Sequence, residues 1–167
     1  MKSFFLTASL LYTTVLFGQA QLDDPLYRKA LTNYRDQQLQ IAYQQVNELL
    51  SEKPTAKAAY LSGLIHEAMG KDLRAVSDYE LAVRLDPTFY EAIFQKSLIY
   101  LKYNDPSQAV ADLNELINAG TFRETRGIYF QMDEHDQQQN QIMSLATLES
   151  QLYYYRGQAY QKLGEFS

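Results

Sequence analysis

Cysteine is absent from this sequence and histidine is scarce, with only His66 and His135 among 167 residues. The lack of cysteine excludes disulfides, thiolate nucleophiles and cysteine-ligated zinc or iron–sulfur sites. With two histidines, most other catalytic and metal-binding constellations lack their usual members. Lysine and arginine total 15 against 20 aspartates and glutamates, so the net charge of −5 argues against binding to duplex nucleic acid. The composition therefore favours a non-enzymatic binding or structural protein without a cofactor.

Neither histidine sits in a motif that organises catalysis. The sequence contains no G-x-S-x-G, Walker, G-x-G-x-x-G or H-E-x-x-H motif. His135 lies in the acidic segment 133–136, where a contiguous run cannot close around one ion without a special loop, so a solvated turn is favoured over a metal site. We therefore predict no catalytic residue and no metal ligand.

The first twenty residues have the three-part pattern of a secretory signal peptide. Lys2 gives a positive start, residues 4–17 are uncharged and mostly apolar, and small residues precede a plausible cleavage site before Gln21. An uncleaved amphipathic anchor helix is the alternative. We predict cleavage of residues 1–20 and export as a periplasmic or secreted protein, with no membrane span in the mature chain.

Small residues recur along the chain at the period of a helical repeat. One series, spaced by 33 and 34 residues inside apolar helical patterns, consists of Ala42, Ala75 and Ala109. Two prolines share the first of these intervals, namely Pro54 and Pro87. A second series, spaced by 33, 34 and 60 residues, consists of Ala30, Gly63, Ser97 and Gly157. A period of about 34 residues is typical of helix–turn–helix repeats, so the chain is predicted to be an all-α solenoid and not a single globular core.

The best-formed repeat spans residues 56–89. Its first predicted helix, about 56–69, carries Gly63, where a neighbouring helix must approach closely. Its second predicted helix, about 72–85, ends before Pro87, because proline cannot continue a helix. The apolar stripe of this second helix, at i, i+4 and i+7, consists of Ala75, Tyr79 and Ala82.

This unit resembles the tetratricopeptide repeat family. The family pattern joins a small residue and an aromatic in the first helix to an A-x3-aromatic and a terminal proline in the second. The matching segments are Gly63-x2-His66, Ala75-x3-Tyr79-x2-Ala82 and Leu85-Asp86-Pro87. The resemblance implies an α-solenoid of such repeats, wound as a right-handed superhelix. It also implies that His66, at the aromatic position of the pattern, is a packed ring.

The predicted regions are a signal peptide (1–20), three repeats within 21–120 (about 23–55, 56–89 and 90–120), an insertion (121–149) and an incomplete fourth repeat (150–167). Within the insertion, an amphipathic helix is expected to start near the glutamine-rich tract at 137–141 and to run toward Leu163. The fourth repeat restores a first helix and a turn without a second helix. We therefore expect a longer parent protein or a terminal cap, and self-association through this half repeat.

An aromatic residue recurs once per repeat at an equivalent point of the first helix. With the same spacings of 33, 34 and 60 residues, the aromatics are Tyr27, Tyr60, Phe94 and Tyr154. Four residues further, on the same helical face, are Leu31, Leu64 and Leu98. The resemblance implies that first helices line a concave groove and that these positions face it, extended by Tyr34 and Leu101. The alternative is that the rings pack between adjacent repeats.

The leading hypothesis is a non-enzymatic scaffold that binds a peptide or protein segment in this groove. Some members of the family hold a carboxylate with Lys and Asn where this chain has Tyr27 and Leu31, and that basic clamp is missing here. One alternative is a platform for glycan or cell-wall polymer, drawn from the 14 tyrosines of the chain. Another is the N-terminal repeat array of a longer protein whose activity lies downstream.

Overall fold

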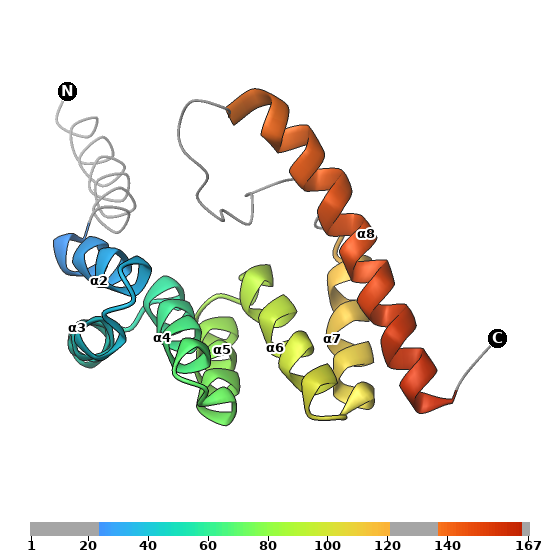
Figure 1. Cartoon of the computed structure of the whole chain (residues 1–167), viewed down its shortest axis with the longest axis horizontal. Helices are drawn as coiled ribbons and strands as arrows, with labels where there is room; N and C mark the ends of the chain where they lie inside the picture. The colour runs from blue at the N-terminus through green and yellow to red at the C-terminus, as the bar shows by residue number, and fades with distance from the viewer. Residues whose placement is uncertain (1–23, 121–136, 165–167) are drawn as a thin grey trace, which may run out of the picture. The chain divides into compact units, whose positions relative to one another are not determined.

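The computed structural model describes residues 24–120 and 137–164, and all regular secondary structure in these ranges is helical (Figure 1). The helices are α2 (Pro25–Arg35), α3 (Leu39–Glu52), α4 (Ala56–Ala68), α5 (Asp72–Leu85), α6 (Tyr90–Lys102), α7 (Pro106–Asn118) and α8 (Gln137–Leu163). The all-α prediction is confirmed. The predicted signal peptide, the acidic segment around His135 and residues 121–136 of the predicted insertion lie outside the described residues.

Polar side chains and prolines set where the helices begin. The Asp24 carboxylate accepts a hydrogen bond of 2.9 Å from the backbone N–H of Leu26, at the start of α2. The Thr55 hydroxyl accepts one of 3.2 Å from the N–H of Ala58, at the start of α4. Asp105 plays the same part before α7, where Pro106 occupies the first helical turn. The two helices expected in the best-formed repeat are found at the predicted places.

The chain divides into two compact units, residues 1–54 and 55–167. In the first unit, α2 and α3 form a helical hairpin, and the small residues Ala30 and Ala42 are fully buried in it. A polar contact also joins the two helices, because the Asn33 amide donates to the Gln45 side-chain oxygen at 2.8 Å. The hairpin is therefore held by small residues at the close approach and by one amide pair beside it.

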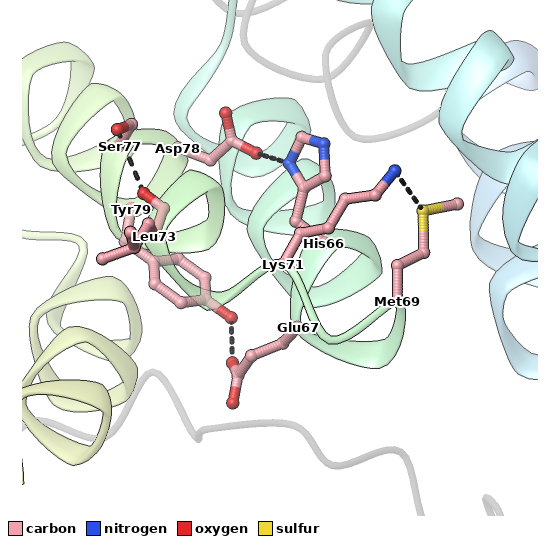
Figure 2. Close-up of polar contacts among 8 residues, drawn as sticks. All are labelled: His66, Glu67, Met69, Lys71, Leu73, Ser77, Asp78 and Tyr79. Carbon is pink, nitrogen blue, oxygen red and sulfur yellow. Dashed lines mark hydrogen bonds and ion pairs between the residues drawn. The ribbon is translucent and has the colours of Figure 1, made fainter. Parts of the chain in front are cut away.

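The second unit contains α4 to α8, and each helix packs against the next one along the chain (Figure 1). The closest approach of α4 and α5 is at Gly63, directly against the ring of the fully buried Tyr79. The Tyr79 hydroxyl donates to Glu67 Oε2 at 2.6 Å, back across the same helix pair (Figure 2). His66 is buried as a packed ring, and its Nδ1 lies 2.6 Å from Asp78 Oδ2. The best-formed repeat is thus locked by one apolar contact and two polar ones.

Helix α8 packs on the last complete pair as one continuous helix of 27 residues. The expected helix from the glutamine-rich tract to Leu163 is therefore confirmed. One core cluster joins α6, α7 and α8 and consists of Ile93, Phe94, Leu113, Leu116 and Leu152. A second consists of Leu101, Ala109 and Ala159. Two polar contacts fasten the same helices: Arg156 donates to Asn114 Oδ1 at 3.2 Å, and Lys162 donates to the backbone carbonyl of Leu101 at 2.9 Å.

The small-residue series separates into buried and exposed members. Five members are fully buried, namely Ala30, Ala42, Ala75, Ser97 and Ala109, and Gly63 is also buried. The two prolines, Pro54 and Pro87, are exposed beyond the ends of α3 and α5. Gly157 was expected at a packing position, but it is exposed, because no described helix covers that face of α8.

Candidate partner-binding surface

The predicted groove residues are divided between the two units. Three of them, Tyr27, Leu31 and Tyr34, lie on α2 in the first unit, and all three are half-buried. Burial raises the pKa of the Tyr27 hydroxyl, and the nearby Arg35 guanidinium opposes that rise. The apolar face of α2 is thus partly exposed and partly packed in its own hairpin. The other six residues lie in the second unit.

Tyr60, on α4, is half-buried between two other aromatic rings. Its ring centroid lies 5.6 Å from that of Tyr79 and 5.2 Å from that of Phe89, which directly precedes α6. Tilted ring pairs at this separation add about 0.5–1.5 kcal/mol beyond their buried area. Tyr60 therefore contributes to packing and also keeps part of its ring at the surface.

Phe94, on α6, does not line an open groove. It is only 8% exposed, it belongs to the core cluster of α6, α7 and α8, and the ring of Tyr155 lies 5.9 Å from it. Leu101 is likewise buried, beside Ala109 and Ala159. Helix α8 covers both side chains because it packs along α6 and α7. For these two residues, the alternative of packing between adjacent repeats is correct.

Tyr154, on α8, has the opposite environment, with 61% of its surface exposed. Its ring rests against Tyr155 at 5.3 Å, and its hydroxyl accepts a hydrogen bond of 2.8 Å from the Gln158 amide. Tyr154 is the last ring of the recurring series, and no described element lies over it. The same register that buries Phe94 therefore leaves Tyr154 at the surface.

The remaining predicted residues, Leu64 on α4 and Leu98 on α6, are half-buried. Together with Tyr60 they form what we call the first-helix stripe: Tyr60, Leu64 and Leu98. Sequence reasoning missed the covering rings, Phe89 and Tyr155. Their signal was available, since Phe89 immediately precedes a first helix and Tyr155 directly follows the recurring Tyr154.

Two buried carboxylates mark the packing between helices of the second unit. Asp72, at the start of α5, accepts from the Lys102 ammonium and from the Tyr103 hydroxyl at the end of α6, and the Lys102 hydrogen bond lowers the pKa of Asp72. Asp112, on α7, lies 3.2 Å from Lys96 on α6. Burial raises the pKa of Asp112 to about 6, against the effect of Lys96. Both pairs connect neighbouring helices and neither forms a cleft for chemistry.

In the described ranges, no cluster of three His, Asp or Glu side chains could hold a metal ion. Across the same residues, no helix has the length and apolar character needed to span a membrane. The surface that the repeats present is therefore one of side chains suited to contact with another molecule.

Comparison with known proteins agrees with the repeat architecture. Residues 56–89 match the family model for the tetratricopeptide repeat. The chain is 35% identical over 68 residues to the human protein "Tetratricopeptide repeat protein 6", a match that covers 41% of this chain and 13% of that protein. Among solved structures, the crystal structure of MamA protein is similar with a TM-score of 0.53 and 15% identity, over 82% of this chain and 70% of that one.

The matched repeat lies where the sequence pattern is best formed, and the helix pairs around it follow the same order. Repeats of this kind support a role as a scaffold for protein–protein interaction. The chain is a member of the tetratricopeptide repeat family and folds as an all-α solenoid.

Proposed function

We propose that this protein binds a peptide or an extended segment of another protein along the first helices of its repeats. The observation that supports this is a difference between the two helices of one repeat. The stripe of α5 is fully buried at Ala75, Tyr79 and Ala82. The first-helix stripe, in contrast, keeps apolar surface accessible on α4 and α6. The proposal assigns the chain a binding role and no catalytic one.

The expected energetics follow from the half-buried state of the stripe. A bound segment would remove the remaining exposed surface of Tyr60, Leu64 and Leu98 from water, and each square ångström buried contributes about 25 cal/mol. These side chains are already held by packing, so binding would immobilise few additional rotamers. Such a site would accept an extended segment with apolar side chains.

A peptide library displayed on phage and selected on the full chain would test this proposal. Binders are then titrated against Leu64→Glu, which places a charge on the stripe. The matched control is Leu73→Glu on α5, because Leu73 is 76% exposed and lies outside the stripe. We expect Leu64→Glu to weaken binding at least tenfold and Leu73→Glu to leave it unchanged. Equal effects of both substitutions would contradict the proposed site.

A glycan platform is the second candidate function. Two neighbouring tyrosines on α8, Tyr153 and Tyr154, are 46% and 61% exposed, and flat aromatic faces of this kind pack against sugar rings. The test is depletion of the full chain from solution by insoluble polysaccharide. Depletion that is lost in Tyr154→Ala would favour this function over peptide binding, and retention of the chain in solution would exclude it.

We also propose that the chain is exported after cleavage of residues 1–20. The support is the sequence pattern alone: a positive residue, an uncharged apolar run and small residues before Gln21. Intact-mass analysis of the natively expressed protein tests this. A mature N-terminus within a couple of residues of Gln21 is expected, and an exported form that retains Lys2 would refute it.

A further inference from the structure

The exposed face of α8 differs from the corresponding face of α4 in one respect, which is the presence of a covering helix. Gly63 and Gly157 belong to the same recurring small-residue series of the first helices. In α4 that position is covered by α5, whereas in α8 it is exposed. We propose that the exposed face of α8 is a self-association surface, on which a second copy of this chain seats its own α8.

The contact between α4 and α5 shows what such a glycine accepts. A Cβ atom built on Gly63 would lie 2.3 Å from Cε1 and 2.6 Å from Cδ1 of Tyr79. The tyrosine ring therefore fills the space that a side chain at Gly63 would take. Figure 2 shows the ring of Tyr79 directed toward the end of α4, where its hydroxyl meets Glu67. This contact is a tyrosine ring seated on a helical glycine.

Helix α8 carries both halves of that contact on one exposed face. A Cβ atom built on Gly157 would meet nothing within 4 Å. Tyr153 and Tyr154 precede it by four and three residues, so they flank it on the same side of the helix. They are 46% and 61% exposed. The face therefore presents an open glycine notch and two aromatic rings beside it.

A second copy fits this face because the face is complementary to itself. When two α8 helices lie antiparallel across a two-fold axis, a tyrosine of each copy can rest on Gly157 of the other. Such an isologous interface uses the same patch on both copies and closes at a dimer. A partner helix of another protein would have to supply the ring, whereas a second copy already has it.

The size of the patch predicts a weak dimer. A tyrosine buries about 150–250 Å² in full, so each half-exposed ring has roughly 100 Å² left to bury. Four such rings and the surface around two glycines stay below the ~1,200 Å² at which stable interfaces begin. Association should therefore depend on concentration, with a dissociation constant in the micromolar range or weaker.

Sedimentation velocity of the purified full chain over a wide concentration range tests the proposal. Gly157→Gln fills the notch without touching any other part of the monomer, and glutamine is the better helix former, so folding should be preserved or improved. We expect this substitution to weaken dimerisation at least tenfold. The control, Leu73→Gln, removes the 76% exposed leucine on α5 and should leave dimerisation unchanged.

Cross-linking gives an independent readout, because the chain has no native cysteine. Under mild oxidation, Gly157→Cys should form a disulfide-linked dimer much faster than Leu73→Cys. A chain that stays monomeric at every concentration would overturn the proposal. Self-association that survives Gly157→Gln, or equal cross-linking of the two cysteine variants, would also overturn it, since the contact would then lie elsewhere.

Discussion

Replacing Gly63 by alanine should destabilise the second unit, although alanine is the better helix former. The added Cβ would lie 2.3 Å from Cε1, 2.6 Å from Cδ1 and 2.9 Å from Cζ of Tyr79. The Tyr79 ring cannot easily move away, because it is fully buried and its hydroxyl is held by Glu67 at 2.6 Å. Overpacking of this kind costs about 1–3 kcal/mol. The gain in helix propensity is about 1 kcal/mol, so a net loss is expected.

Gly157→Ala is the matched control, since it adds the same Cβ where nothing lies within 4 Å. It should raise stability by up to about 1 kcal/mol, so the two variants should differ by roughly 1–3 kcal/mol. Urea unfolding of the full chain, followed by circular dichroism, measures both midpoints. Adding Tyr79→Leu to Gly63→Ala should recover part of the loss relative to Tyr79→Leu alone. A neutral Gly63→Ala, or one as stable as Gly157→Ala, would refute the reasoning.

Two further predictions concern burial and charge. Phe94→Ala should lower stability by about 3–5 kcal/mol, because Phe94 lies in the core cluster, whereas Tyr154→Ala should change it by no more than about 0.5 kcal/mol; urea unfolding checks both, and equal effects would contradict the assigned burial. The folded-state pKa of Asp112 is about 6, above its usual 3.8, so the contribution of this group to stability is full below about pH 4 and is lost as pH rises through 6. Asp112→Asn should remove that part of the pH dependence in unfolding midpoints measured between pH 4 and 8, and an unchanged slope would argue against a buried carboxyl.

The repeat architecture could be predicted from the sequence because its signals are local. Small residues at a fixed period mark close helix approaches, and Pro87 and Pro106 mark a helix end and a helix start. These signals placed α4 and α5 within one residue of their observed bounds. The long helix α8 followed from its apolar spacing after the glutamine-rich tract.

The exposure of the aromatic series could not be predicted in the same way. Tyr60, Phe94 and Tyr154 share one register, yet the first is half-buried, the second buried and the third exposed. Burial at this register depends on the next helix along the chain, which brings Tyr155 onto Phe94 and no described element onto Tyr154. A repeat pattern reports the position of a residue within its own unit and carries no information about its neighbour.

The most direct test of the proposed binding surface is methyl NMR of the full chain, labelled at leucine and titrated with a selected peptide. The methyl signals of Leu64 on α4 and Leu98 on α6 should shift in a saturable way with one common affinity. The exposed Leu73 on α5 and the buried Leu113 on α7 should not shift. Shifts at Leu73 without shifts at Leu64 and Leu98 would show that partners bind elsewhere and would contradict the account.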